Sequence, residues 1–339
     1  MTGGSKRPAS LSSRPPLARE AEDRLLFAPD SRAFGCSLAT PRKFEMALES
    51  NEGRSAMSVS KAAFALVHGG WHNHSVWDRI VPILNAQGFA ALTLDLPGAG
   101  VNAIAPTSLS LRPFDPAAFA AERSPIAGVT QEERTQAVVA LVREAASLGD
   151  GKVILVGHSA GGLTISAVAE QVPELLLAVV YLTGFLLPNG MQVFAMLQHE
   201  TMSSSLGPGL FVGDSAATGA TRINVGSADD AYRSRLKAAF YGDVSDSEFE
   251  HAASQLHCDE PVGAVTPSGI TPGRFGTVPR HYIRCTQDRA IPLTGQDHMI
   301  ATVDGAIGGK TTIHTLESSH SPFLSQPAAL SKILVGIWG

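Results

Sequence analysis

Cysteine is scarce in this chain of 339 residues, with single copies at positions 36, 258 and 285. An odd number of cysteines without a CxxC pair argues against a disulfide framework and against a zinc knuckle. A chain without disulfides fits a reducing compartment, so we expect a cytoplasmic location and no structural metal.

Long apolar runs and clusters of one charge are also missing. The longest apolar run, residues 175–187, falls short of the ~20 residues that a membrane-spanning helix needs. No lysine or arginine run exceeds two residues and the formal net charge is -5. The chain therefore has no electrostatic footprint for nucleic acid or for an anionic membrane, and we expect neither partner. The sequence leaves monomer and homodimer both open.

Residues 1–60 lack the pattern of a folded domain. They are rich in Arg, Ser and Pro and show neither a strand period nor a helix period, so we predict a disordered N-terminal extension. They also lack the apolar core of a secretory signal. Their seven acidic residues argue against an organellar transit peptide.

Strands and helices alternate from residue 61 onward. The apolar strands AAFALVH, FAALTLDL, KVILVGH and LLAVVYLTGF are separated by helical segments, one of which is opened by a capping box between Thr130 and Glu133. After residue 275 the alternation returns with RHYIRCTQD, TGQDHMIATV, KTTIHTLES and QPAALSKILVGIW. Strands this apolar are typical of a parallel sheet buried on both faces. We predict an α/β core with a mostly parallel, doubly wound sheet over residues 61–189 and 276–339.

Two segments interrupt this alternation. Residues 190–275 are rich in Met, Phe, Gly and Ser, and we predict that they form an inserted cap. Residues 101–128 carry four prolines and no clear period, which is typical of a functional loop. Five apolar residues in or beside the cap either line a substrate cavity or pack it: Phe194, Met196, Phe211, Phe240 and Phe275.

The segment from Gly157 to Gly162, GHSAGG, matches the pattern GxSxG. The pattern is short, but a strand precedes it and an Ala/Leu/Ile-rich helix follows, which is the context of a nucleophile on a strained strand-to-helix turn. Gly157 and Gly161 remove side chains where strand and helix approach closely. We predict that Ser159 is a nucleophile.

A serine hydroxyl needs a histidine base, and that base needs an orienting carboxylate. In this architecture the chain order is serine, acid, histidine. Asp288 follows the strand HYIRCTQ, and His320 follows the strand TIHTLES, so both lie at the carboxyl ends of strands, where α/β sheets bind ligands. The rival acids and bases fall within or beyond predicted helices and strands and are weaker: Asp297, Asp304, His298 and His314.

Acyl transfer also needs two backbone N–H groups to hold the developing oxyanion. Ala160 directly follows the nucleophile, and Gly70 follows an early strand, so we predict these two as the donors. The same early stretch, HGGWHNHSVWD, contains His68, His72 and His74 and could instead suggest a metal site. The HxHxDH spacing of metallo-hydrolases is absent, so we expect no metal there.

Two further signals are weaker. Residues 98–103 fit the form GxGxxA of a dinucleotide site, but no helix pattern follows to hold a pyrophosphate. The residues His257, Cys258 and Asp259 have the types of a cysteine hydrolase, yet adjacent side chains cannot form a relay, and we expect them on the cap surface.

Six motifs together resemble the α/β-hydrolase superfamily: HGGWHNHSVW, LDLPGAG, VILVGHSAGG, YLTGFLLPNG, YIRCTQDRAIP and SSHSPFLSQPAAL. The branch they resemble holds bacterial pyrethroid-hydrolase-like esterases, plant methyl esterases and hydroxynitrile lyases. The resemblance implies Ser159 as nucleophile, His320 as base and Asp288 as its partner, with Gly70 and Ala160 forming the oxyanion hole. These are the five residues that the chemistry had already indicated.

The chain departs from the lyases of that branch, which carry a threonine and a lysine where this chain has Gly69 and Ser321. We therefore expect a carboxylesterase without a cofactor, acting on small to medium hydrophobic or aromatic esters. A lactone or carbon-carbon bond hydrolase with the same triad, and a binding protein of low turnover, are the alternatives. The residues expected to contact substrate are Gly69, Trp71, Phe185, Phe194 and Phe323.

Overall fold

The apolar strands form one parallel sheet of six strands. They are β1 (Ala63–Val67), β2 (Ala91–Thr93), β3 (Val153–His158), β4 (Leu176–Leu182), β8 (Arg280–Cys285) and β9 (Thr312–Leu316), in the order β2-β1-β3-β4-β8-β9. Every neighbouring pair is parallel. All residues of β1 and β3 are buried, which explains their uninterrupted apolar sequences.

The structure is a computed structural model that describes residues 61–266 and 269–339. The predicted disordered extension, residues 1–60, lies outside the described residues. The described residues form one compact unit.

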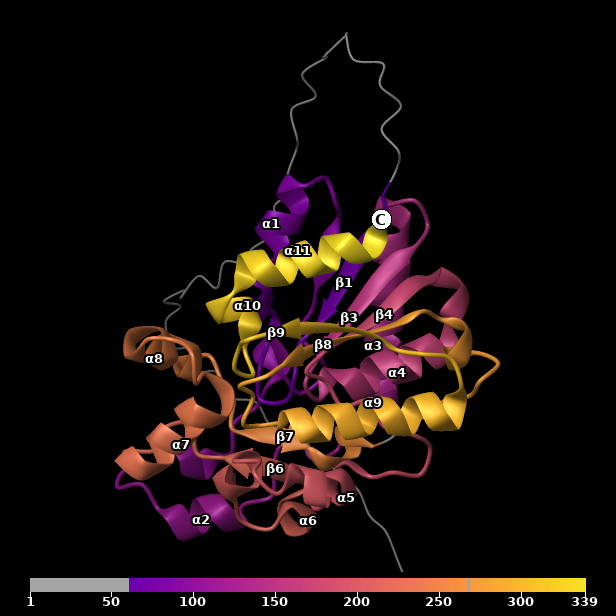
Figure 1. Cartoon of the computed structure of the whole chain (residues 1–339). Coiled ribbons are helices and arrows are strands. Elements are labelled where there is room, and N and C mark those ends of the chain that lie inside the picture. Colours follow the sequence, from indigo (N-terminus) through magenta and orange to yellow (C-terminus); the bar gives the residue numbers. More distant parts are fainter. Residues whose placement is uncertain (1–60, 267–268) are drawn as a thin grey trace, which may run out of the picture. The chain divides into compact units, whose positions relative to one another are not determined.

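Helices cover both faces of the sheet (Figure 1). On one face, α3 (Gln131–Leu148), α4 (Gly161–Gln171) and α9 (Leu293–Ile307) share an apolar core with the strands. On the other face, α1 (Val81–Ala86) and α11 (Pro327–Trp338) pack with Trp77 and Phe323. The prediction of a doubly wound α/β fold is confirmed.

Local sequence explains where these helices begin and end. α3 starts at the predicted capping box, in which the Thr130 side chain accepts the Glu133 N–H and the Glu133 carboxylate accepts the Thr130 N–H. α4 ends before Pro173, whose ring cannot continue a helix.

Between β4 and β8 the chain forms a small antiparallel sheet with helices around it. The strands are β5 (Phe211–Val212), β6 (Ala220–Ile223) and β7 (Asp259–Pro261), and the helices are α5 (Val193–Leu197), α6 (Ser215–Thr218), α7 (Asp230–Phe240) and α8 (Asp246–Ser254). Leu210, Leu236 and Phe249 belong to its own apolar core. We call residues 190–275 the cap; these bounds are those expected from the sequence, and they stay a prediction.

Short helical turns and one further helix complete the described chain. The 3-10 turns are η1 (His74–Trp77), η2 (Gly100–Asn102), η3 (Thr107–Ser110), η4 (Pro173–Leu175), η5 (Glu200–Met202), η6 (Gly207–Leu210), η7 (Val262–Val265) and η8 (Phe275–Thr277). The last helix before α11 is α10 (Pro322–Ser325). No helix within the described ranges combines the length and the apolar character that crossing a bilayer requires.

The proline-rich residues 101–128 are more ordered than their sequence pattern indicated. They contain α2 (Pro116–Ala121), which begins at Asp115 because that side chain accepts two backbone N–H groups of the first turn. Arg222 of β6 donates to the backbone carbonyls of Phe119 and Glu122 and pairs with Asp259. This segment is therefore attached to the cap sheet.

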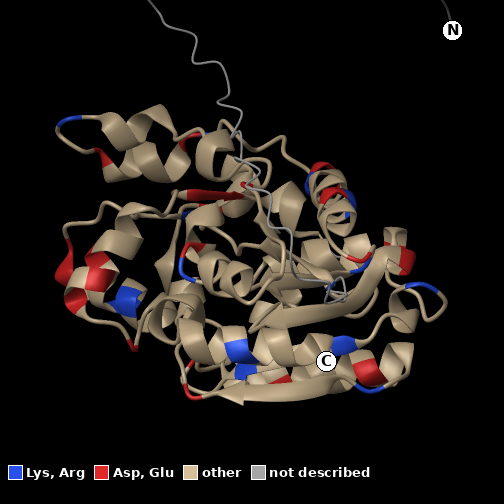
Figure 2. Ribbon diagram, turned by 90° about the horizontal axis from the view of Figure 1, so that it is seen from above, with Lys and Arg blue, Asp and Glu red and all other residues tan. Residues whose placement is uncertain are grey.

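The prediction that residues 257–259 lie on the cap surface is wrong. Cys258 and Asp259 are only 3% and 2% exposed, because β7 pairs with β6 and the buried Arg222 neutralises Asp259. Burial also raises the pKa of the Cys258 thiol to about 12. Viewed from above, acidic and basic residues of the described chain are interspersed around the ribbon (Figure 2).

Candidate active site

Ser159 lies between the last residue of β3 and the first residue of α4, and its backbone is strained. Its φ of 51° is in the left-handed region, which residues with a side chain rarely adopt. A Cβ atom on Gly161 would lie 2.5 Å from the His68 carbonyl oxygen, and one on Gly157 would lie 2.9 Å from the Gly161 oxygen. Glycine at both positions therefore permits the tight turn that presents the serine.

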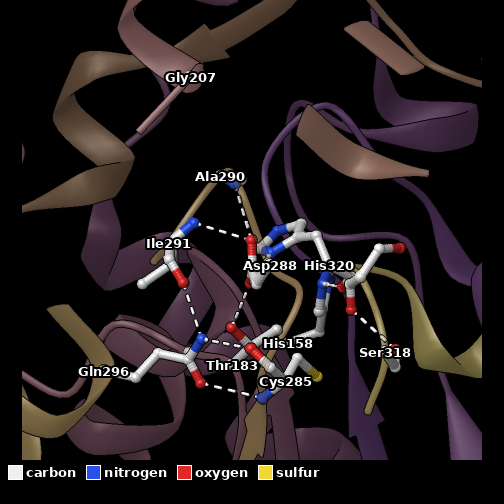
Figure 3. A network of polar contacts seen from close by, with 12 residues as sticks. His158, Thr183, Gly207, Cys285, Asp288, Ala290, Ile291, Gln296, Ser318 and His320 are labelled. Carbon is white, nitrogen blue, oxygen red and sulfur yellow. Dashed lines mark hydrogen bonds and ion pairs between the residues drawn. The ribbon is translucent and has the colours of Figure 1, made fainter. Parts of the chain in front are cut away.

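His320 and Asp288 form a buried pair (Figure 3). His320 Nδ1 lies 2.7 Å from Asp288 Oδ2, and the two side chains are 1% and 0% exposed. Asp288 follows β8 and His320 follows β9, so adjacent parallel strands bring them together. The Nε2 atom of His320 makes no hydrogen bond with any described residue, and neither does the Ser159 hydroxyl.

Three further donors hold the Asp288 carboxylate. Oδ1 accepts the N–H groups of Ala290 and Ile291 at 2.7 and 2.9 Å, and Oδ2 also accepts the Thr183 hydroxyl. Gln296 connects the two sides of the loop that carries Asp288, because its side-chain amide binds the backbone of Cys285 before it and the Ile291 carbonyl after it (Figure 3). The carboxylate therefore has a fixed orientation toward the imidazole.

His158 supports the same histidine from the opposite side. Its Nε2–H donates to the His320 carbonyl oxygen at 3.0 Å, and the two ring centroids are 4.6 Å apart. Burial and the neighbouring His320 hold the pKa of His158 well below its usual value, so the ring is neutral. Nδ1 of His158 has no partner among the described residues.

The loop after β1 contains a peptide whose N–H has no hydrogen-bond partner among the described residues. His68 Nδ1–H donates to the Gly69 carbonyl at 2.8 Å, while His68 Nε2 accepts the Leu96 N–H at 3.1 Å. In a trans peptide the C=O and N–H point in opposite directions. With Gly69 O turned toward His68, the Gly70 N–H faces the other way, and it makes no hydrogen bond with a described residue.

Gly70 and Ala160 lie on one side of a cavity that also contains Ser159. A Cβ atom on Gly70 would lie 3.7 Å from the Ala160 Cβ, so the two backbone segments face each other. The Ala160 N–H, like that of Gly70, has no hydrogen-bond partner within the described chain. The structure thus brings both predicted oxyanion donors to the serine.

Apolar side chains form most of this cavity. Its lining residues are Gly70, Trp71, Ser159, Ala160, Phe185, Val193, Phe194, Leu197, Gly207, Phe211, Thr221, Phe240, Glu260, Val265, Ala290 and Ile291. Phe240 also packs against the His320 ring, with the centroids 5.7 Å apart. The cap and the residues that follow Asp288, Ala290 and Ile291, therefore line the space in front of Ser159.

Three of the five predicted substrate contacts lie in the cavity wall, and two do not. Trp71, Phe185 and Phe194 line it. Gly69 instead packs behind the nucleophile, where an added Cβ would meet the Ser159 Cβ at 2.7 Å. Phe323 is buried between His158 and Trp77, at ring distances of 4.9 and 5.7 Å. We therefore assign Gly69 and Phe323 to packing around the site.

The five apolar cap residues also divide between the two expected roles. Phe194, Phe211 and Phe240 line the cavity. Met196 and Phe275 are fully buried in the main core and have no access to it. Size and aromatic character alone could not separate these groups.

The rival acids and bases lie elsewhere. Asp297 pairs with Arg284, and Asp304 holds Arg280 and Thr311. His298 stacks on His199, and His314 on His281, with ring distances of 4.1 and 5.4 Å. None of these side chains contacts Ser159 or the cavity.

The three histidines after β1 do not converge on a common point. Both ring nitrogens of His68 are used by the backbone, and those of His72 are used by the Gly70 carbonyl and the Tyr241 hydroxyl. His74 instead binds Asp95 at 2.9 Å. Within residues 61–266 and 269–339, no group of three His, Cys, Asp or Glu side chains could hold a metal ion.

Several residues of the site had no sequence signal. Thr183 has a φ of 37° and binds Asp288 from the end of β4. Glu260 borders the cavity, and Tyr241 contacts the loop after β1. Their partners lie 105 to 189 positions away in the chain. No local period or motif predicts such contacts.

Comparison with known proteins extends these observations. A family model described as "Alpha/beta hydrolase family" matches residues 64–333. The putative chloroplastic methylesterase 11 of Arabidopsis thaliana is 25% identical over 334 residues, covering 97% of this chain and 74% of that protein. The pyrethroid hydrolase of Sphingobium wenxiniae is 26% identical over 275 residues, with 79% and 85% covered. These relatives confirm the predicted branch.

Solved structures show the same fold. A pyrethroid hydrolase from Sphingobium faniae JZ-2 aligns with a TM-score of 0.63 at 23% identity, covering 81% of this chain and 96% of that one. Polyneuridine aldehyde esterase aligns with a TM-score of 0.62 at 20% identity, covering 82% and 99%. With the family model matching most of its length, the chain belongs to the alpha/beta hydrolase family.

Proposed function

We propose that this protein is a serine carboxylesterase with Ser159 as nucleophile, His320 as base and Asp288 as the partner of that base. The observation that carries the proposal is the strained Ser159, which lies in an apolar cavity beside two backbone amides that have no hydrogen-bond partner among the described residues. Esterases among the relatives support the reaction class.

The proposed reaction proceeds through an acyl-enzyme. Ser159 Oγ attacks the ester carbonyl carbon while its proton passes to His320 Nε2, and the oxyanion binds the N–H groups of Gly70 and Ala160. The C–O bond to the alcohol then breaks, and His320 returns the proton to the leaving oxygen. Water then attacks the acyl carbonyl carbon while its proton passes to His320; the bond to Ser159 Oγ breaks as His320 returns that proton to the serine, and the carboxylic acid leaves.

The pair of His320 and Asp288 suits this role. Nδ1–H of His320 is bound to the carboxylate, which fixes the tautomer with its lone pair on Nε2. Four hydrogen bonds hold the carboxylate itself, so the imidazole does not need to reorient during the reaction.

The cavity wall indicates the substrate class. Phe185, Phe194, Phe211 and Phe240 present aromatic surface, which favours acyl or alcohol groups without charge. We infer small to medium hydrophobic or aromatic carboxylic esters as substrates.

The test compares p-nitrophenyl acetate and butyrate hydrolysis by the wild type, Ser159→Ala and the control Ser147→Ala, which changes an exposed serine at the end of α3. Ser159→Ala is expected to lose turnover by at least about 10³-fold, and Ser147→Ala to retain it. Hydrolysis that survives Ser159→Ala would overturn the assignment.

An organophosphate probe separates the remaining alternatives. Labelling of Ser159 without ester turnover would indicate another leaving group, to be sought with lactone and carbon-carbon substrates. Absence of labelling would indicate a binding protein without a working nucleophile.

A further inference from the structure

Hydrogen bonds hold both the carbonyl and the N–H of the peptide between Gly70 and Trp71, and each connects the peptide to a residue of the cap. This peptide directly follows the one whose N–H is the proposed oxyanion donor. Fixing it restricts where the Gly70 N–H can point, because the two peptides are joined at the Gly70 Cα.

The carbonyl end is held through His72 and Tyr241. His72 Nδ1–H donates to the Gly70 oxygen at 2.7 Å, and His72 Nε2 accepts the Tyr241 hydroxyl at 2.9 Å. Tyr241 ends α7 and is 2% exposed. Burial raises the pKa of Tyr241 and lowers that of His72 to about 3, so the phenol is a donor and the imidazole is neutral.

The amide end is held through Glu260 and Arg134. The Trp71 N–H donates to Glu260 Oε2 at 3.4 Å, and the guanidinium of Arg134 in α3 donates hydrogen bonds to both oxygens of that carboxylate. The two charged side chains are 3% and 4% exposed, and Arg134 also donates to the Pro97 carbonyl at 3.0 Å. Burial alone would raise the pKa of Glu260, but the Arg134 charge lowers it below its usual value.

Trp71 needs such support because its backbone is strained. Its φ is 60°, a left-handed conformation that is unfavourable for a large side chain. Two more bonds attach it to the cap: its carbonyl accepts the His257 N–H at 3.0 Å, and its indole donates to the Thr221 carbonyl at 2.9 Å. Strain of this kind persists only where surrounding contacts enforce it.

We propose that Tyr241 and Glu260 of the cap are positioning residues. They fix the two ends of the Gly70–Trp71 peptide and so orient the loop after β1, which carries the Gly70 N–H. The proposal rests on the oxyanion role given to Gly70 in the proposed function. It gives the cap a part in catalysis besides enclosing the substrate.

Tyr241→Phe and Glu260→Gln test the two ends separately. Each is expected to lower kcat for p-nitrophenyl butyrate about tenfold with KM unchanged, which is less than the roughly 10²–10³-fold cost of losing an oxyanion donor outright. A trifluoromethyl ketone, which forms a tetrahedral adduct on the serine, should lose affinity by the same factor as kcat in each variant.

Each variant has a matched control in the same element. Tyr232→Phe removes a hydroxyl of α7 that binds the Leu210 carbonyl and the Asn224 N–H and makes no hydrogen bond with the described residues 69–72. Asp259→Asn breaks a buried pair with Arg222 on the strand that carries Glu260. Both should lower the melting temperature as their counterparts do and leave kcat and ketone affinity unchanged.

Crystal structures of Tyr241→Phe and Glu260→Gln separate this proposal from the proposed function. A rotated Gly70–Trp71 peptide supports the positioning role even if the wild type hydrolyses no ester. Unchanged peptide orientation together with Ser159-dependent turnover at the wild-type rate would overturn it. Losses of kcat equal to those of the two controls would also overturn it, since they would reflect only a weakened cap.

Discussion

Burial keeps four histidines around the site neutral. It lowers the pKa of His68 to about 4, of His72 to about 3 and of His257 to about 4, and it holds the pKa of His158 well below its usual value. In an unfolded chain a histidine titrates near pH ~6.5. A neutral imidazole retains the lone pair that accepts the Leu96 and Tyr241 hydrogen bonds.

The lowered pKa values of these histidines determine how the stability of the protein depends on pH. Below about pH 6.5 the unfolded chain binds protons that the native histidines do not bind, so the free energy of unfolding falls as the pH falls toward 4. Each histidine contributes up to about 1.4 kcal/mol per pH unit in that window, and its full stabilisation is present above about pH 6.5. Urea unfolding between pH 5 and 8 measures the slope.

His257→Leu is the variant that isolates one of these groups. Neither ring nitrogen of His257 has a hydrogen-bond partner among the described residues, so the change removes a titration and no hydrogen bond of the ring. The slope should decrease by about one proton. An unchanged slope would contradict this account.

Single residues also show what sequence could and could not predict. Chain order and strand ends predict Ser159, Asp288 and His320 from the sequence, because chemistry restricts which types can occupy those places, and the structure brings His320 and Asp288 into contact. The roles inferred for Tyr241 and Glu260 depend on contacts that only the folded cap creates. No residue type or spacing distinguishes them from other buried cap residues.

At the scale of an element, α4 depends on a glycine at its first position. A Cβ on Gly161 would lie 2.5 Å from a backbone oxygen, which cannot move as a flexible side chain could. Gly161→Ala should therefore cost about 1–3 kcal/mol and also displace Ser159. Thermal unfolding and esterase assays measure the two effects.

Gly305 in α9 is the matched control for that change. It is exposed, and nothing lies within 4 Å of an added Cβ. Gly305→Ala should stabilise the protein by about 0.5–1 kcal/mol, since alanine loses less entropy in a helix. A Gly161→Ala protein as stable and active as this control would show that the elbow can relax.

Elements with strong local signals were predicted well, and elements without them were not. The α3 capping box and the apolar β3 were evident from sequence and are confirmed. The short α2 in residues 101–128 was missed because its prolines obscure any period, and its packing depends on Arg222 from a distant strand.

At the scale of the whole molecule, one buried arginine of the cap connects it to the proline-rich residues 101–128. Arg222 donates to the carbonyls of Phe119 and Glu122 and forms an ion pair with Asp259. Arg222 and Asp259 are 0% and 2% exposed. Arg222→Leu leaves a carboxylate unpaired and two carbonyls without their donor, which should cost about 3–5 kcal/mol. Urea unfolding followed by circular dichroism and by tryptophan fluorescence should give coincident transitions, because the described residues form one compact unit.

A double variant, Arg222→Leu with Asp259→Leu, provides the comparison. Removing both charges should restore part of the lost stability, since no ion remains buried alone. Two separate transitions, or a double variant less stable than the single one, would contradict the argument.

The chain leaves the sheet at β4 and returns at β8, and these two strands are neighbours. Because the two strands are parallel, the intervening segment leaves at the carboxyl end of β4 and re-enters at the amino end of β8. Its ends are therefore anchored on adjacent strands, about 4.8 Å apart across the sheet, and three register positions apart along it, from Leu182 to Arg280. A replacement segment would have to supply the apolar contacts that Met196 and Phe275 make with the main core beside the sheet. On the positioning role proposed above, such a segment would also need residues that replace Tyr241 and Glu260, so that the loop after β1 keeps its orientation.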